Sequence, residues 1–497
     1  MNRTAVINVV GLSEALLGEH TPRIVQFVKN GRLARVTPAF PAVTCSAQST
    51  YLTGMPPAAH GIVGNGWYNR ELAEVQFWKQ SNHLVTGRKV WEELRDKAAI
   101  ADGSSARTDR FTCATLFWWF NMYSTADYAI TPRPMYPANG RKVFDIYTWP
   151  YSIRAEIKHD LGEFPFHTFW GPAAGVQTPQ GPPDAASRWI AESAKWIEKK
   201  YQPTLSLIYL PHLDYNLQRH GSQIPLNRPS DAPPPSDGEW GQGGVNPTII
   251  GDLRAMDAIV GDLIDFFRRH SVQIVLLSEY GITNVDTPIH LNRLLRREGL
   301  ITLKEELGLE LLDCGASKVF AVADHQVAHI YLNDPSLRFR VRELLQTWDG
   351  VGHVLDKAEQ APLGIAHPRS GDLIAVAEEN CWFTYYYWLN DARAPDFART
   401  VDIHRKPGYD PVELFLDPRL AFPKFKIVWR LLQKRLGFRM LMDVIPLDAS
   451  LVKGSHGRRP EKPQDWPVLI TERSELLPAP QIEARDVFHV LLRHVRH

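Results

Sequence analysis

The most regular feature of the chain is a series of short apolar runs that alternate with helical patterns. The runs are rich in β-branched and aromatic residues and lack apolar–polar alternation, which predicts strands covered on both faces, as in a parallel sheet. The four clearest runs are AVINVV at 5–10, TCATLF at 112–117, LSLIYL at 205–210 and QIVLLS at 273–278. We therefore predict an α/β fold, with a layered core around a mainly parallel central sheet.

The stretch between the last two runs contains a loop and a helix. Apolar residues from Ile250 to Phe267 recur at helical spacing, with charged residues on the other faces. Before them, residues 225–247 are dense in Pro and Gly and have no apolar period, which predicts a long surface loop. Loops of this length are usually functional or disordered, so this loop could act as a lid or could be disordered.

The pattern changes after residue 289 and again after residue 380. LNRLLRREGL, KVFAVA, VAHIYL, VRELLQTW and DLIAVA follow one another as helix, strand, strand, helix and strand. This order predicts a small α/β cap subdomain at 290–380, inserted into a core formed by 1–289 and 381–497.

Composition and charge narrow the function classes. The 497 residues include 56 basic and 55 acidic residues, so no overall field attracts the chain to nucleic acid, and we expect no nucleic-acid binding. The four cysteines are far apart and form no CxxC pair, which argues against a zinc knuckle or a disulfide framework. The apolar run 5–10 is too short for a signal-peptide core, and no stretch approaches the ~18–20 apolar residues of a membrane span. These features predict a cytoplasmic protein.

Chemically useful side chains stand at the ends of the predicted strands. Asp214 and Glu279 follow two of the apolar runs, Thr44 lies in a Pro-flanked segment, and His456 lies near the carboxyl terminus. Ligands of open α/β sheets bind at the carboxyl ends of parallel strands, so these side chains could converge there.

Five motifs occur in an order that extends across nearly the whole chain. They are FPAVTCSAQSTYLTG at 40–54, HGIVGN at 60–65, YLPHLDYNLQRHG at 209–221, SEYGI at 278–282 and GSHG at 454–457. Together they resemble the nucleotide pyrophosphatase/phosphodiesterase and phosphonoacetate hydrolase branch of the alkaline phosphatase superfamily. The resemblance implies that superfamily's layered core, with a small inserted cap.

The resemblance also implies a reaction and several residue roles. In such enzymes two zinc ions about 4 Å apart hold a phosphoryl group while a metal-bound Thr alkoxide attacks phosphorus. On this basis Thr44 matches the nucleophile, Asp214 and His456 match two ligands of one metal, and Asn65 matches the side chain that hydrogen-bonds a phosphate oxygen.

Four positions depart from the family pattern. Val10 stands where a metal-binding Asp is expected, Gln218 replaces a His, Glu279 replaces an Asp, and Tyr280 replaces a His. We interpret Tyr280 mainly as a packing residue that can contact substrate beside Asn65. The metal that would activate Thr44 therefore retains few ligands.

The remaining ligands predict one divalent ion rather than two. Asp214, Gln218, Glu279 and His456 are the candidate ligands, with zinc favoured. Magnesium or manganese held by Asp214, Glu279 and Gln218 is an alternative, and the absence of any metal stays open.

Further histidines could supplement the site. His212 and His220 lie close to Asp214 in the sequence and are substitute ligands if they point the same way. His325 and His329 have i, i+4 spacing but lie in a predicted strand-turn-strand, so we favour structural roles for both. We interpret His404 as a loop histidine.

The segment 424–439, KFKIVWRLLQKRLGFR, is basic and amphipathic. Such a helix usually packs its apolar stripe on the core, which is the interpretation we favour. Peripheral contact with an anionic membrane is the alternative.

Two functions are compatible with these features. The first is a hydrolase of a phosphate diester, pyrophosphate or phosphonate ester, with a phosphorylated small molecule as substrate; we favour it because Thr44 and Asn65 are both retained. The second is a pseudoenzyme of the same fold that binds a phosphorylated metabolite or a partner protein.

Overall fold

A nine-stranded sheet forms the centre of the protein. The computed structural model describes residues 1–102, 111–138, 141–179, 181–223, 245–438 and 440–497. In spatial order the strands are β21 (Gln481–Glu483), β2 (Arg32–Thr37), β20 (Val468–Thr471), β9 (Gln273–Leu277), β1 (Thr4–Val9), β8 (Leu205–Leu210), β5 (Cys113–Leu116), β6 (Tyr128–Pro132) and β7 (Ile146–Trp149). The predicted mainly parallel α/β sheet is confirmed.

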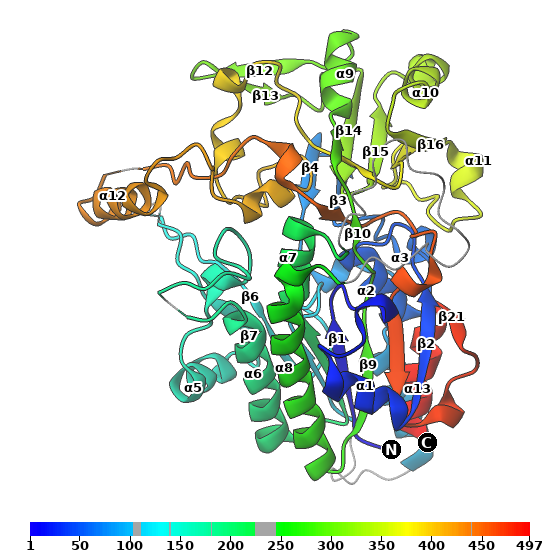
Figure 1. Cartoon of the computed structure of the whole chain (residues 1–497). Helices are drawn as coiled ribbons and strands as arrows, with labels where there is room; N and C mark the ends of the chain where they lie inside the picture. The colour runs from blue at the N-terminus through cyan, green and yellow to red at the C-terminus, as the bar shows by residue number, and fades with distance from the viewer. Residues whose placement is uncertain (103–110, 139–140, 180, 224–244, 439) are drawn as a thin grey trace, which may run out of the picture.

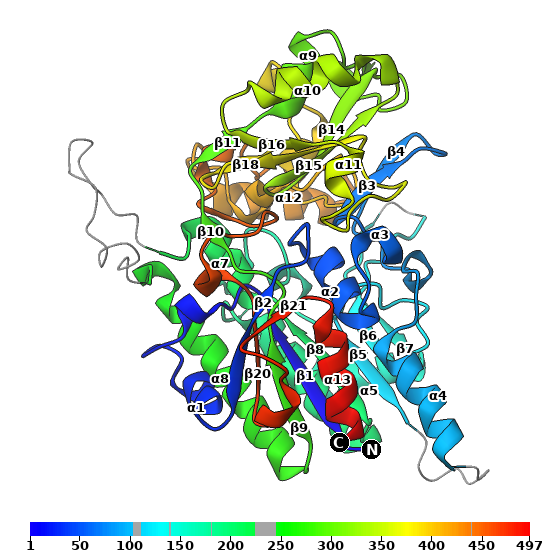
Figure 2. The same ribbon diagram turned by 90° about the vertical axis from the view of Figure 1, so that its right-hand side faces the viewer.

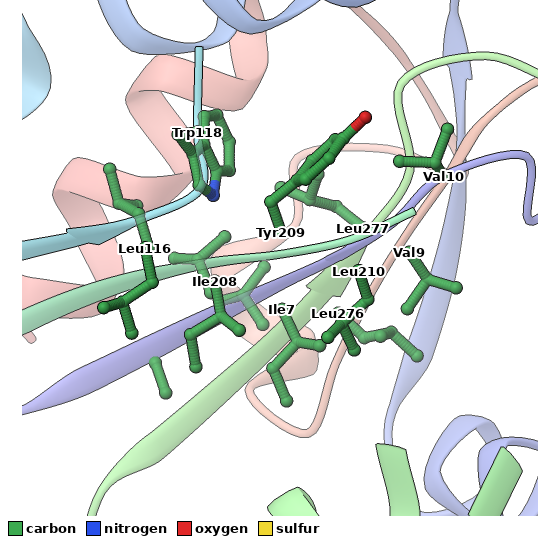
Figure 3. Close-up of a cluster of buried hydrophobic side chains, with 14 of the residues drawn as sticks. Ile7, Val9, Val10, Leu116, Trp118, Ile208, Tyr209, Leu210, Leu276 and Leu277 are labelled. Atoms are coloured by element: carbon green, nitrogen blue, oxygen red, sulfur yellow. The ribbon is translucent and has the colours of Figure 1, made fainter. Parts of the chain in front are cut away.

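The four apolar runs of the sequence are the middle of this sheet. They form β9, β1, β8 and β5, which are adjacent and parallel, with Val6 paired to both Leu207 and Val275. All six residues of β1 and of β8 are buried, because helices cover both faces. Figure 3 shows this core, where Ile7, Ile208 and Leu276 pack side by side.

Helices form a layer on each side of the sheet (Figures 1 and 2). One layer contains α1 (Pro22–Lys29), α5 (Ser152–Leu161), α6 (Ala185–Tyr201), α7 (His212–His220) and α8 (Ile250–Arg269), and the other contains α2 (Thr44–Thr53), α4 (Val90–Asp102) and α13 (Asp486–Arg496). The helix predicted from Ile250 to Phe267 is α8. The loop predicted at 225–247 lies outside the described residues, except for its last three positions.

A second, antiparallel sheet lies beyond the carboxyl ends of the central strands (Figure 1). Its order is β14 (Val319–Asp324), β15 (Val327–Leu332), β17 (Leu373–Ala377) and β16 (Val351–Leu355). The helices α9 (Leu291–Arg297) and α10 (Arg338–Gln346) and the hairpin β12 (Leu303–Glu306) with β13 (Leu309–Leu312) accompany it. The sequence predicted α9, β14, β15, α10 and β17, but not the hairpin β12–β13 or the strand β16. The domain boundaries themselves stay a prediction.

Two features of the second sheet position the site. The turn between β14 and β15 is only two residues long, and His325 in it has φ +62°, a left-handed conformation that is uncommon outside glycine. One apolar cluster joins this sheet to the segment around Thr44, since it contains Phe40, Cys45, Val327 and Ile374. The hairpin tip is therefore held against the carboxyl edge of the central sheet.

Besides several short 3-10 helices, the described chain contains further strands and α-helices. They are β3 (Gly66–Asn69), β4 (Glu74–Phe77), α3 (Pro57–His60), β10 (Thr283–Asn284), β11 (Thr287–Ile289), α11 (Lys357–Gln360), β18 (Cys381–Phe383), α12 (Pro423–Arg435) and β19 (Gly454–Ser455). Across the described residues, we find no helix with the combination of length and apolar character that a bilayer crossing requires.

Candidate active site

Three chain segments meet at the carboxyl edge of the central sheet. Thr44 is the first residue of α2, Asp214 lies in the first turn of α7 directly after β8, and Glu279 and Tyr280 follow β9 by two and three residues. All four side chains are buried. This convergence follows from the parallel order of β9, β1 and β8, which ends these strands at one edge.

A chain of hydroxyl contacts connects Thr44 to Asp214. The Tyr280 hydroxyl lies 3.2 Å from Thr44 Oγ1 and donates to Asp214 Oδ1 at 3.3 Å. Either hydroxyl can be the donor in the contact between Thr44 and Tyr280, and the Thr44 hydroxyl also hydrogen-bonds the Glu279 carboxyl. Tyr280 is therefore a polar link between the two residues, in addition to the packing role predicted for it.

Gln218 uses both ends of its amide within the protein. Its Nε2 donates to Asp214 Oδ2 at 2.8 Å, while its Oε1 accepts from the Tyr409 hydroxyl at 2.9 Å. Burial raises the pKa of Asp214 to about 7, although the hydrogen bonds from Gln218 and Tyr280 act in the opposite direction. The amide oxygen that would ligate a metal thus points to Tyr409.

Glu279 is held by two amides that the sequence analysis did not single out. Its Oε1 accepts from Asn8 Nδ2 at 2.6 Å and from Gln48 Nε2. The Trp119 N–H donates to Gln48 Oε1 at 2.6 Å, which turns the Gln48 amino group toward the carboxylate. Burial raises the pKa of Glu279 to about 8.

A sequence signal existed for both amides. Asn8 is a polar residue inside an apolar strand pattern, and Gln48 lies four residues after Thr44, on the same face of a helix. Buried polar side chains need hydrogen-bond partners, so these two positions are the sequence features from which a buried contact could have been inferred.

His456 lies among aromatic rings. Its Nδ1 is 2.7 Å from the Ala42 carbonyl oxygen, and its ring stacks on Tyr280 with 3.6 Å between centroids. On the other side the His325 ring lies 3.7 Å away, and His325 in turn stacks on Tyr409. Burial lowers the pKa of both histidines well below the usual value, so both rings are neutral. His325 therefore lies next to the site. The sequence analysis favoured a structural role for it and did not place it near these residues.

The hairpin tip also occupies the donors of Asn65. The Asn65 backbone N–H donates to Asp324 Oδ2 at 2.7 Å and its Nδ2 donates to Asp324 Oδ1 at 3.1 Å. The Asn65 Oδ1 accepts from the Cys45 N–H at 3.0 Å, next to Thr44. Burial raises the pKa of Asp324 to about 6. A carboxylate from the second sheet thus lies where the resemblance implies that a phosphate oxygen would bind.

The other histidines are engaged elsewhere. His212 begins α7 and its Nε2 lies 2.7 Å from Asp252 Oδ1, so the condition for a substitute ligand, a strand that continues to Asp214, is not met. His220 is exposed at the other end of α7. His329 lies 3.0 Å from the Val63 carbonyl, and His404 lies 3.3 Å from that of Phe77.

These residues do not fit the family's metal centre. Val10 directly follows β1, and its side chain contains only carbon, as Figure 3 shows. Within the described ranges, three or more His, Cys, Asp or Glu side chains are nowhere grouped so that they could hold a metal ion. The carboxylates of Asp214 and Glu279 instead accept hydrogen bonds from amide and hydroxyl groups.

Positive charge is also scarce at this edge. Among the described residues, neither lysine nor arginine forms an ion pair with Asp214, Glu279 or Asp324. The contacts of the described residues join Thr44 to Asp214 through Tyr280, without a lysine or arginine paired to the Asp214 carboxylate. The roles predicted for Thr44 and Asn65 stay predictions.

Solved structures with the same fold include hydrolases. The chain is similar to phosphonoacetate hydrolase from Sinorhizobium meliloti 1021, solved with phosphonoformate, at 15% identity and a TM-score of 0.57, covering 99% of this chain and 96% of that one. It is also similar to murine ectonucleotide pyrophosphatase/phosphodiesterase 5, solved as an inactive variant with AMP, at 14% identity and a TM-score of 0.53, covering 100% and 95%. At these identities the likeness establishes the fold.

The sequence itself identifies the family. No curated protein sequence matches the chain. The sequence pattern of one family, type I phosphodiesterase / nucleotide pyrophosphatase, matches residues 4–410, which include β1, the Thr44 segment and both strand ends of the site. Because this match covers most of the chain, the protein belongs to the type I phosphodiesterase / nucleotide pyrophosphatase family.

Proposed function

We propose that this protein is a pseudoenzyme of the phosphodiesterase family, which acts by binding a partner and does not hydrolyse phosphate esters. One observation carries the proposal: the carboxylates of Asp214 and Glu279 are each held by side-chain hydrogen bonds within the protein. A divalent ion would have to replace these bonds, and the neighbouring positions hold Val10 and Tyr280 in place of ligands.

The chemistry of threonine supports the same conclusion. A Thr hydroxyl becomes a strong nucleophile only when a cation or a base removes its proton. Phosphoryl transfer further depends on cations that neutralise the phosphoryl oxygens. Among the described residues, the polar side chains that contact the Thr44 hydroxyl are those of Tyr280, Tyr209 and Glu279, and none of them carries positive charge.

The position of Asp324 argues against a phosphorylated metabolite as the bound partner. Its carboxylate already accepts hydrogen bonds from the Asn65 backbone N–H and from Nδ2, so a phosphate at this place would meet a second acidic group. We therefore favour a macromolecular partner or surface over a phosphorylated small molecule. The cytoplasm remains our proposed compartment, supported by four buried cysteines that form no disulfide.

Metal content and turnover test the proposal together. We expect purified protein to contain no stoichiometric zinc, manganese or magnesium, and to hydrolyse nitrophenyl phosphodiesters and phosphonates no faster than its Thr44→Ala variant. Turnover that disappears in Thr44→Ala would overturn the proposal.

A restored variant provides the positive control. Val10→Asp, Gln218→His, Glu279→Asp and Tyr280→His together rebuild the ligand pattern implied by the family resemblance. We expect this fourfold variant to bind zinc, as measured by metal analysis after dialysis, and to lose part of it when His456→Ala is added. Equal zinc content in the restored variant and the natural chain would contradict our account of the missing ligands.

A metal-independent hydrolase is the second candidate, and the hydroxyl chain from Thr44 to Asp214 favours it. Thr44 Oγ1 would bond to phosphorus as the leaving-group bond breaks, its proton would pass to Tyr280, and the Tyr280 proton to Asp214. The leaving-group oxygen would depart with the proton held by Asp214. Water would then attack phosphorus and break its bond to Thr44 Oγ1, giving up one proton to Asp214, which returns through Tyr280 to Thr44. Turnover that persists with chelator and disappears in both Thr44→Ala and Tyr280→Phe would establish this function instead.

A further inference from the structure

The helix α12 exposes its apolar stripe to solvent. Phe425, Val428, Trp429, Leu432 and Leu436 lie on one face at helical spacing, and their exposed fractions are 70%, 62%, 50%, 43% and 65%. Surface helices of globular proteins normally bury such a stripe. The packing on the core that we favoured from sequence is therefore wrong for this helix.

The opposite face of α12 explains its orientation. Lys426 Nζ lies 2.9 Å from Asp443 Oδ2 and Arg430 Nη2 lies 3.0 Å from Asp443 Oδ1. Ile427 packs on the neighbouring apolar cluster that contains Tyr387 and Trp388. These contacts hold the charged face toward the protein, so the apolar face points away from it.

The exposed apolar surface extends past both ends of the helix. Phe422 before α12 is 75% exposed and Phe438 after it is 65% exposed. Figure 1 shows α12 at the side of the molecule, projecting beyond the ribbon of the second sheet and away from the central sheet. The helix is thus accessible to a flat, extended partner.

The charge around the apolar stripe indicates what kind of partner α12 binds. Residues 422–443 contain six lysines and arginines and one acidic residue, Asp443, which pairs with Lys426 and Arg430. The segment is therefore basic, although the whole chain has a net charge of only +1. Lys424 and Arg435 are exposed beside the stripe. A second copy of the chain would bring two such basic helices together, and their like charges would repel. An anionic lipid surface offers both an apolar layer and negative headgroups.

We propose that α12 binds an anionic phospholipid surface, with the Phe425–Leu436 stripe at the headgroup boundary and Lys424 and Arg435 at the lipid phosphates. The proposal does not depend on whether Thr44 reacts, because α12 contributes no residue to the site at the central sheet.

Flotation of the full-length protein with vesicles tests the proposal. We expect binding to vesicles of phosphatidylcholine with ~30% phosphatidylserine at low salt, weaker binding as salt rises, and little binding to phosphatidylcholine alone. The Phe425→Ser/Trp429→Ser variant should partition at least about tenfold less, since it removes the apolar anchors. Lys424→Glu/Arg435→Glu should weaken binding to anionic vesicles by a similar factor.

A matched control distinguishes binding through α12 from nonspecific hydrophobic binding to vesicles. Phe339 in α10 is 84% exposed, so Phe339→Ser removes an exposed Phe elsewhere and should leave vesicle binding unchanged. No binding to anionic vesicles, equal binding to neutral ones, or binding unaffected by the α12 variants would overturn the proposal. Stable dimers without lipid that dissociate in Phe425→Ser/Trp429→Ser would also overturn it, in favour of a second copy as the occupant.

Discussion

At the scale of single residues, the site is a buried network in which carboxyl groups face amides, hydroxyls and neutral imidazoles. Asp214, Glu279 and Asp324 all have raised pKa values, each mainly because burial disfavours the charged form. Such a network is stable only while each group keeps its partners and its protonation state. Measurements of the free energy of unfolding should therefore detect changes in this network, whether or not a reaction occurs there.

The pH dependence of stability should reveal Glu279. Its pKa is about 8 in the folded protein and about 4 in an unfolded chain, so its stabilising effect is complete below pH ~4 and is lost as pH rises through about 8. We expect the free energy of unfolding to fall between about pH 6.5 and pH 8.5, and Glu279→Gln to reduce that slope by up to about 1.4 kcal/mol per pH unit. Urea unfolding at several pH values measures this.

The control for this experiment is Glu305→Gln, because the Glu305 side chain is 64% exposed. It should keep the natural slope. His325 and His456, whose pKa values burial lowers, affect stability only as pH falls below about 6.5, outside the window. An unchanged slope in Glu279→Gln would contradict the assignment of a raised pKa to Glu279.

Asp324 should stabilise the folded protein by accepting hydrogen bonds from Asn65. Asp324→Ala leaves the buried N–H and Nδ2 of Asn65 without their acceptor, so we expect a loss of about 2–4 kcal/mol in the free energy of unfolding. Asp324→Asn retains one acceptor oxygen and should lose less. Denaturant unfolding compares the two variants, and equal losses would argue against this hydrogen-bond account.

At the scale of elements, short connections after the central strands place the site. Glu279 and Tyr280 are fixed because β9 ends at Leu277 and Gly281 then passes close to the Asp465 backbone. A Cβ on Gly281 would lie 1.7 Å from the Asp465 carbonyl oxygen, far inside any contact distance. The glycine thus allows the close approach that sets where the preceding two side chains point.

Gly281→Ala should therefore be strongly destabilising, by more than about 2 kcal/mol, because the backbone of one segment must move. Gly251→Ala is its matched control, since nothing lies within 4 Å of a Cβ there and the residue is in α8. We expect that control to be neutral or stabilised by up to about 1 kcal/mol. Thermal or urea unfolding distinguishes them, and a stable Gly281→Ala would refute the close-approach argument.

At the scale of the whole molecule, the two sheets are joined by buried apolar side chains. The cluster with Phe40, Cys45, Val327 and Ile374 contains residues from the segment around Thr44 and from the second sheet. The hairpin tip with Asp324 and His325 is therefore part of a packed interface and approaches the site with it.

This shared cluster predicts that the protein unfolds in one cooperative transition. Calorimetry should give a single peak whose calorimetric and van't Hoff enthalpies agree. Val327→Ala, which opens a cavity in the cluster, should lower that single transition temperature without splitting it. Two separate transitions in the natural protein would contradict the coupling.

The local pattern of apolar and polar residues was enough to predict much of the fold. The four buried strands, the helix from Ile250 and the strand-turn-strand around His325 follow from apolar runs and periodicity, which act over a few residues. The convergence of Thr44, Asp214 and Glu279 also follows, since parallel strands end at a common edge. The family resemblance, carried by five motifs, was likewise contained in the sequence.

Partners far apart in the chain could be decided only by the tertiary structure. The amides of Asn8 and Gln48 on Glu279, and the Asp324 carboxylate at Asn65, join residues from separate segments whose approach depends on how the layers pack. The orientation of α12 also depends on a contact outside the helix. Its amphipathic pattern is visible in the sequence, but the ion pairs with Asp443 determine which face packs against the protein. Periodicity defines the faces of an element, whereas packing against the rest of the chain decides where each face points.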